Sequence, residues 1–160
     1  MKSSGKGMKV ESSKDFWDWA VGQYENEHLR ASLLALQESQ GLIILEAMYV
    51  AWLGRRGQQI SVSEHQQLRA AITPWVNSIV LPLRRQRRLW SEDTAMMTNR
   101  SHLLGLELDA ERVLAKILAA ALPVDPLQPQ GADCTHQNLA LIAELEDDRA
   151  RASLIGLFGK

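Results

Sequence analysis

The feature that most constrains this chain is a run of twelve residues, LIILEAMYVAWL at 42–53, which contains one charged residue, Glu46. A helix that is apolar on nearly every face has to be buried on every side, so this run predicts the central helix of a helical core. It is too short to cross a bilayer, which takes about 20 apolar residues. Because an unpaired buried charge is costly, the Glu46 carboxylate must be neutralised, paired or turned outward.

Length and composition are those of a globular chain with one domain of ordinary size. The 160 residues suffice for a sizeable core, and a hydrophobic content of 46% with 23% charged residues argues against wholesale disorder. The net charge of −1 means that attraction to nucleic acid or a membrane surface would need a local patch. The single cysteine, Cys134, excludes an internal disulfide and a multi-cysteine metal site. With no secretory signal and no membrane-length apolar segment, we expect a cytoplasmic protein.

Helix signals recur along the chain and strand signals are nearly absent, which predicts an all-α fold. We expect a compact bundle of six to seven helices around the buried helix at about 42–53. The expected organisation is a disordered tail at 1–11, a helical domain at 12–122, a proline-rich linker at 123–134 and a moderately amphipathic C-terminal helix at 135–160. The linker would let that last helix swing away from the domain.

Local signals predict where several helices begin. Ser12 or Ser13 is expected to cap the first helix, and Ser63-Glu-His-Gln66 forms a capping-box pattern for a later one. Pro74 suits the first turn of a new helix. Pro82 is then expected to kink that helix or to end it early, because proline lacks the amide hydrogen that a helix interior needs.

Four charged residues lie on helix faces that should be buried. At 100° per residue, Arg87 projects from the apolar side of the helix after Pro74, Glu107 lies within the apolar stripe of the following long helix, and Arg100 is near its edge. With Glu46, they describe either a polar pocket in which arginines hold a phosphate or carboxylate ligand, or an ion-pair network that fixes helix register. We favour the structural interpretation, since long Arg and Glu side chains also reach solvent from such positions.

The run RRQRR at 84–88, followed by Trp90, is the one strongly basic stretch of the chain. Arg84, Arg87 and Arg88 could contact phosphates while the tryptophan stacks on a base. The slightly acidic chain and the occurrence of a single such run instead favour a solvated helix face that pairs with acidic neighbours.

The tryptophans are numerous for a chain of this length. Trp17 and Trp19 lie about 200° apart on one helix, so both cannot be fully buried in the same core. A packed core with one exposed tryptophan is the simpler interpretation, and a tryptophan that faces a groove or a partner is the sharper one.

Patterns for metal or covalent chemistry are incomplete. A di-iron bundle needs two Glu-x-x-His motifs, and the chain has one, from Glu25 to His28. The acidic ELEDD at 144–148 is a single motif where magnesium diphosphate sites of isoprenoid synthases use two, and a solvated helix face explains it. Cys134 and His136 are neighbours in sequence, which does not create the geometry of a catalytic pair. We predict no catalytic residue, no metal site and no cofactor.

Four landmarks follow one another along the chain: FWDWAVGQY at 16–24, LLALQESQG at 33–41, AWLGRRG at 51–57 and W-x-x-x-x-V-x-P-L-R-x-x-R-R at 75–88. In this order they resemble an uncharacterised bacterial family of short, all-helical cytoplasmic proteins with no assigned activity, over roughly residues 15–120. The matching positions are Phe16, Trp17, Tyr24, Leu36, Gln37, Gly41, Trp52, Trp75, Pro82, Leu83, Arg84, Arg87 and Arg88.

The chain also departs from that pattern. Glu25-Asn26-Glu27-His28 stands where the family has Pro-Gly after the tyrosine, and Glu38, Ile43 and Leu45 stand where it has Asp, Asp and Asn. If those polar positions formed a site, this member has lost much of it. The resemblance therefore implies an all-helical fold and no particular reaction.

The leading functional interpretation is a non-enzymatic helical interaction or adaptor module. It would use an exposed tryptophan face and the surface at 84–88 to hold a protein partner or an anionic ligand. The alternative is a small-molecule-binding protein or enzyme with an interior Glu/Arg pocket. Weak nucleic-acid binding through the same arginines is a third interpretation, which predicts an affinity that falls steeply with salt.

Overall fold

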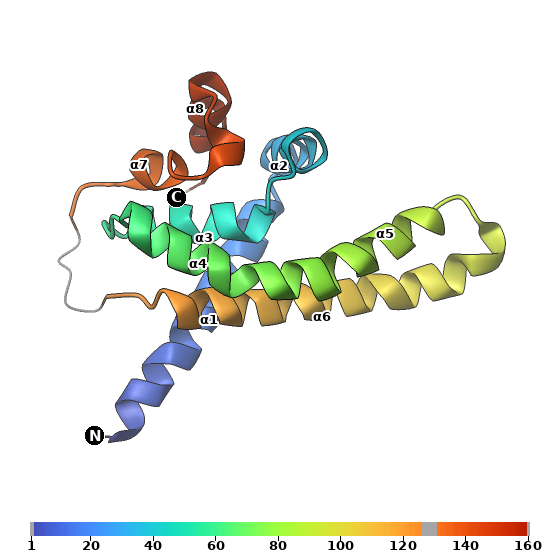
Figure 1. Ribbon diagram of the computed structural model, residues 1–160, viewed down its shortest axis with the longest axis horizontal. Helices are drawn as coiled ribbons and strands as arrows, with labels where there is room; N and C mark the ends of the chain where they lie inside the picture. The colour runs from blue at the N-terminus through green and yellow to red at the C-terminus, as the bar shows by residue number, and fades with distance from the viewer. Residues whose placement is uncertain (1, 126–130, 160) are drawn as a thin grey trace.

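The computed structural model describes residues 2–125 and 131–159, with side chains from residue 13 onward, and in this range the chain is all-α (Figure 1). The elements in chain order are α1 (Lys2–Tyr24), α2 (Glu27–Gln40), α3 (Ile44–Arg55), α4 (Val62–Trp75), the π-helical turn η1 (Val76–Val80), α5 (Leu81–Leu89), the 3-10 turn η2 (Thr94–Met96), α6 (Met97–Ala121), α7 (Thr135–Leu139), the 3-10 turn η3 (Ala143–Leu145) and α8 (Asp148–Leu157). No helix among the described residues combines the length and the apolarity needed to cross a membrane.

Helix α3 is the centre of the core. Every residue from Leu45 to Gly54 is buried, and α1, α2, α6 and α7 all pack against this helix. On one side, the ring of Phe16 meets the ring of Tyr49 edge-on, and the Tyr49 hydroxyl donates a hydrogen bond of 2.6 Å to the Leu122 carbonyl. The prediction of an all-α bundle around a central helix at about 42–53 is confirmed.

The chain passes through both prolines without leaving the helical conformation. Pro74 lies inside α4, so the expectation that it opens a new helix is wrong, while Pro82 stands in the first turn of α5. Between them the helix widens to the π form, and the Leu81 amide donates to the Val76 carbonyl five residues back. A wider turn accommodates the carbonyls that a proline leaves without a donor.

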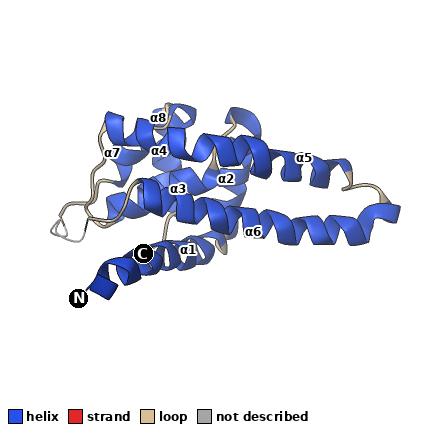
Figure 2. Cartoon of the chain, turned by 60° about the horizontal axis from the view of Figure 1, so that its bottom comes forward, coloured by secondary structure: helices blue, strands red, loops and turns tan. Residues whose placement is uncertain are grey.

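Helices α5 and α6 form an antiparallel hairpin whose far end projects from the rest of the molecule, as both ribbon views show (Figures 1 and 2). We call the projecting part, residues 81–108, the arm. None of the residues of α5 is buried. The α5 part of the arm is therefore covered along one side only, and its other side is exposed to solvent.

Two helix starts differ from the expected ones. The capping box of α4 uses Ser61 and Glu64, which exchange hydrogen bonds of 2.9 and 3.0 Å, because Ser61 has the extended backbone of a cap while Ser63 is already helical. Helix α1 begins at Lys2, so it runs through the segment expected to be a disordered tail. Extending a helix that the core already holds avoids the cost of nucleating one.

The C-terminal segment is not the single helix expected at 135–160. It is divided into α7, η3 and α8, because Ile142 adopts an extended conformation and Asp147 caps a new helix by accepting a hydrogen bond from the Arg149 amide. The segment packs on the core in the same chain: Asn138 accepts from the Ile60 amide and donates to the carbonyls of Val50 and Gln58. The prediction of a proline-rich linker at 123–134 falls partly outside the described residues, which omit 126–130.

Candidate binding groove between the arm and helices α1 and α2

A groove of about 920 Å³ lies between helices α1 and α2, the start of α3, and the continuous helix α4–α5 with its neighbour α6. Pockets for small ligands range over ~300–1,000 Å³, so this volume is at the upper end. Its apolar lining consists of Trp17, Ala20, Val21, Leu34, Leu42, Ile43, Ile44, Leu45, Met48, Val76, Val80, Leu81, Leu108 and Leu114. These side chains come from six helical elements and from the loop between α2 and α3, so the complete groove exists only in the folded chain.

The rim of the groove is apolar as well as its interior. Val21 of α1, Leu34 of α2, Leu81 of α5 and Leu108 of α6 are 45, 40, 36 and 49% exposed. Single exposed apolar residues are ordinary on a protein surface, but here four of them surround one hollow. Covering this rim would remove apolar surface from water, which favours binding of a partner with an apolar part.

The charged lining is mainly arginine. It consists of Arg30, Arg69, Arg84, Arg85, Arg87 and Arg88, against Glu25, Glu107, Glu111 and Glu144. Glu38 and Glu46 are not part of the lining but pair with Arg88 and Arg69, so the lining arginines without an ion pair to a described residue are Arg30 and Arg85. These two positions are thus where the groove can offer positive charge to an anionic partner.

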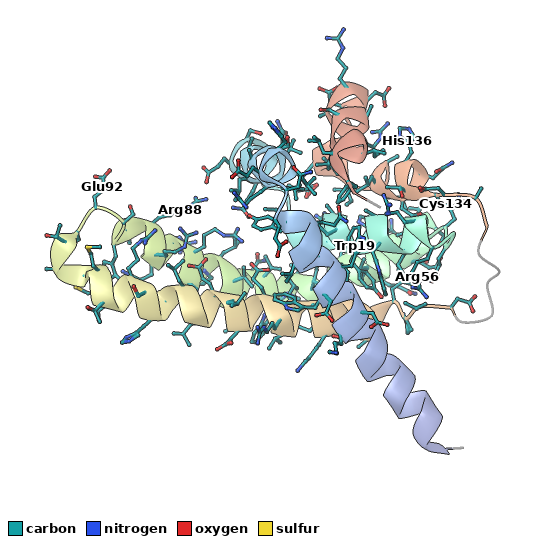
Figure 3. All side chains as sticks on the ribbon, turned by 180° about the vertical axis from the view of Figure 1, so that it is seen from behind. Trp19, Arg56, Arg88, Glu92, Cys134 and His136 are labelled. Carbon is teal, nitrogen blue, oxygen red and sulfur yellow. The ribbon has the colours of Figure 1, made fainter. Side chains whose placement is uncertain are left out.

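Ion pairs from α5 to α6 and α2 hold three of these six arginines. Nε of Arg87 donates to Glu107 at 2.5 Å, the Arg84 guanidinium lies 3.5 Å from Glu111, and Arg88 pairs with Glu38 of α2 across the groove. Arg88 is labelled on the arm in Figure 3, with Glu92 at the arm's tip. Of the four arginines at 84–88, Arg85 is the one with no ion pair to a described residue, and it is exposed.

The Arg84–Glu111 pair is the loosest of these contacts. Burial raises the pKa of the Glu111 carboxyl above 4.5, and the negative charge of Glu107 adds to this rise, while the guanidinium of Arg84 opposes it. The folded chain therefore holds the charged form of Glu111 less firmly than solvent would. Arg84 is consequently the paired arginine that a competing anion can take over most easily.

At the other end of the groove, Arg69 binds the buried carboxylate of Glu46. Two hydrogen bonds of 2.6 Å join the guanidinium to both carboxylate oxygens, and a third contact of 3.0 Å joins it to Glu144. Nε2 of His65 lies 3.7 Å from the same carboxylate, beyond hydrogen-bonding distance. Glu46 itself has no exposed surface, so its charge is compensated by the bidentate arginine in particular.

These contacts set the ionisation of Glu46. Burial acts to raise its pKa, but the interactions with His65 and Arg69 and the positive charge of Arg69 outweigh burial and hold the pKa below 4.5. A carboxyl with a lowered pKa contributes stability that is complete above its unfolded-state value and is lost as the pH falls through its folded-state value.

We therefore expect the urea midpoint of unfolding to decrease as the pH is lowered below about 4.5, and the decrease to be smaller in Glu46→Gln, which has no proton to gain there. The measurement is the midpoint followed by tryptophan fluorescence over that pH range for both proteins. Equal pH slopes for the two would show that other carboxyls produce the acid sensitivity.

The structure brings some of the sequence-predicted residues together and separates others. Trp17, Arg84, Arg87, Arg88 and Glu107 all line the groove. The expected interior set of Glu46 with Arg87, Arg100 and Glu107 is not one network, because Glu46 pairs with Arg69 while Arg87 pairs with Glu107.

The remaining three predicted residues lie elsewhere. Arg100, in the first turn of α6, is outside the groove lining, and its buried Nε makes no hydrogen bond to a described residue. Trp19 stacks on Phe158 with 5.7 Å between ring centroids, which holds α1 against the C-terminal segment. Trp90 is the C-terminal cap of α5. Trp17, whose ring lies 5.6 Å from the Arg112 guanidinium, is thus the tryptophan that faces the groove.

Among the charged groove residues, sequence reasoning did not single out Arg30, Arg69 and Glu111, and it placed Glu144 on a solvated helix face. Glu111 follows Glu107 by four residues, so it had the spacing that puts two carboxylates on one helix face, and this signal could have found it. Arg69 is separated from Glu46 by 23 residues and had no local signal.

Comparison with known proteins gives one family match. The model of a family described as a protein of unknown function (DUF2390) matches residues 15–118. This range contains most of the groove lining, from Trp17 to Leu114, and excludes Glu144 and the C-terminal segment. No curated protein and no solved structure matches the chain.

Proposed function

The chain belongs to this family of unknown function, and we propose that it acts as a non-enzymatic binding module whose groove holds an anionic partner with an apolar part. One observation carries the proposal: the groove of about 920 Å³ combines an exposed apolar rim with arginines, of which Arg85 has no ion pair to a described residue. An apolar body would cover the rim, while an acidic group would meet Arg85 or replace Glu111 at Arg84.

The charges of the groove favour a partner that binds at the arm over nucleic acid and over a ligand held inside the core. For nucleic acid, a continuous set of free arginines would be needed, but Arg84, Arg87 and Arg88 each pair with a glutamate. For a ligand held inside the core by Glu46, that carboxylate would have to leave Arg69, and a buried carboxylate without a partner is costly. Binding of an anionic partner in the groove at the arm needs neither a continuous set of free arginines nor the release of Glu46 from Arg69.

The test compares two substitutions on the same helix. Leu108→Glu places a charge in the groove, whereas Leu106→Glu places it on α6 outside the groove, and the two leucines are 49 and 53% exposed. We expect native mass spectrometry of protein purified from its own host to show a companion mass with the natural chain and with Leu106→Glu. We expect Leu108→Glu to lose that mass, because a glutamate would repel the anion and wet the apolar rim.

Each result of that comparison bears on the proposal. A companion that survives Leu108→Glu binds somewhere other than the groove, and the proposal then fails. The same holds if Leu106→Glu and Leu108→Glu release it equally. Circular dichroism of both variants shows that the helical content is retained, so that a loss of binding is not a loss of folding.

A further inference from the structure

We infer that the occupant of the groove is an acidic, amphipathic α-helix of a partner protein, which lies along the arm and completes a three-helix arrangement with α5 and α6. This inference rests on the proposed function and specifies the partner. Its evidence is the extent of the apolar surface, the incomplete packing of α5 and the sign of the charges.

The apolar surface that runs from the groove along α6 is longer than a small ligand. Beyond the groove, the stripe on α6 continues from Leu108 to Leu104 and Met97, which are 42 and 62% exposed. Their spacings of four and seven residues put all three on one side of the helix. Eleven helical residues span about 16 Å, which matches about three turns of a docked helix rather than one compact molecule.

Helix α5 lacks a neighbour on its open side. It is the last part of the helix that runs on from α4 through η1, and although it packs against α6, none of its nine residues is buried. Its groove side presents Leu81, Arg84, Arg85 and Arg88, which follow the three- and four-residue spacing of one helix face. A third helix that packed there would bury Leu81 and Leu108 together, as helix-in-groove complexes do.

The charges of the groove favour an acidic helix as its occupant and disfavour a second copy of this chain. Arg85 is exposed without an ion pair to a described residue, and Arg84 holds Glu111 only at 3.5 Å. An acidic side chain on the flank of the incoming helix would meet both guanidiniums. Two copies that joined these faces would instead place arginine opposite arginine, and like charges across an interface oppose association.

The experiment pans a displayed library of helical peptides against the full chain. The library fixes leucine at positions i, i+3 or i+4, and i+7 and randomises all other positions. We expect enriched peptides to carry Asp or Glu on the flank of the leucine stripe. We also expect their affinity to fall at least about tenfold in Arg85→Glu and to be unchanged in Lys116→Glu, an exposed residue of α6 outside the groove that undergoes the same change of charge.

Dodecyl phosphate, an apolar chain with an anionic head, is the second probe. One outcome is that dodecyl phosphate binds to the natural chain and not to Leu108→Glu, while no peptide is enriched on the natural chain relative to Leu108→Glu. The proposal of a helical partner is then wrong, and the groove remains a site for an anionic amphiphile. If neither the peptides nor dodecyl phosphate binds, the proposed function fails together with the inference. Enriched peptides without acidic residues, or acidic peptides that bind Arg85→Glu and Lys116→Glu equally, would also overturn the proposed occupant.

Discussion

Arg69→Met is expected to lower the free energy of unfolding by about 3 kcal/mol, because it leaves a charge in the core without a partner. Glu46 has no exposed surface and receives two hydrogen bonds of 2.6 Å from the Arg69 guanidinium. Glu144 would lose its contact with Arg69 in the same step. His65, 3.7 Å from the Glu46 carboxylate, is too far to replace the arginine without a rearrangement. Urea unfolding followed by fluorescence measures the difference.

Two further variants distinguish this explanation from simple loss of a side chain. Arg85→Met removes the same side chain at an exposed site that has no ion pair to a described residue, and we expect a change within about 0.5 kcal/mol. Adding Glu46→Gln to Arg69→Met removes the stranded charge, and we expect it to recover a part of the lost stability. If the double variant is less stable than Arg69→Met alone, the stranded charge is not the cause.

Gly54→Ala is expected to destabilise the chain by about 3 kcal/mol, near the upper limit for overpacking a core. A β-carbon at Gly54 would lie 2.6 Å from the Thr135 amide nitrogen and 2.8 Å from the Cys134 carbonyl carbon, which are backbone atoms and cannot rotate away. The close approach is required because the Cys134 amide donates a hydrogen bond of 2.8 Å to the Gly54 carbonyl. Helix α7 would therefore have to move away from α3.

Gly105→Ala is the matched control for this substitution. Gly105 is also inside a helix, but no described atom outside its own stretch of helix lies within 4 Å of its added β-carbon. We expect a gain of about 0.5–1 kcal/mol there, since alanine favours the helix over glycine. The thiol of Cys134, the single cysteine, reports on α7 directly, and it should react faster with a thiol reagent in Gly54→Ala than in the natural chain. Unchanged stability and labelling would mean that α7 does not pack on α3 in solution.

Local pattern was sufficient for the secondary structure of the core and for part of the groove. The apolar run at 42–53 predicted a helix buried on all sides because hydrophobic residues on every face leave no side for water. Helical spacing also separated Trp17 from Trp19, and the structure turns one to the groove and the other to Phe158. The buried helix and the separation of the two tryptophans could both be predicted because helical periodicity is local information.

The remaining contacts of the candidate site depend on packing between segments that are distant in the sequence, and no local pattern predicts such packing. Arg69 neutralises Glu46 from another helix, and Glu144 joins this pair from the C-terminal segment, 75 residues beyond Arg69. Glu46, Arg87, Arg100 and Glu107 do not form one network for this reason: the inward direction of side chains on separate helices does not determine which of them meet. Whether Pro74 ends a helix was likewise settled by the π-helical turn at 76–80, which accommodates the proline in the helix that leads into the arm.

The amino-acid sequence alone was enough to predict an all-α chain, its central helix and the cluster of arginines at 84–88. The groove, the pairing of those arginines with Glu38, Glu107 and Glu111, and the exposure left at Arg85 emerged only when the helices packed together. The physical reason is that hydrophobic periodicity acts within one helix, whereas a binding surface depends on the distances between helices, which the whole core sets at once.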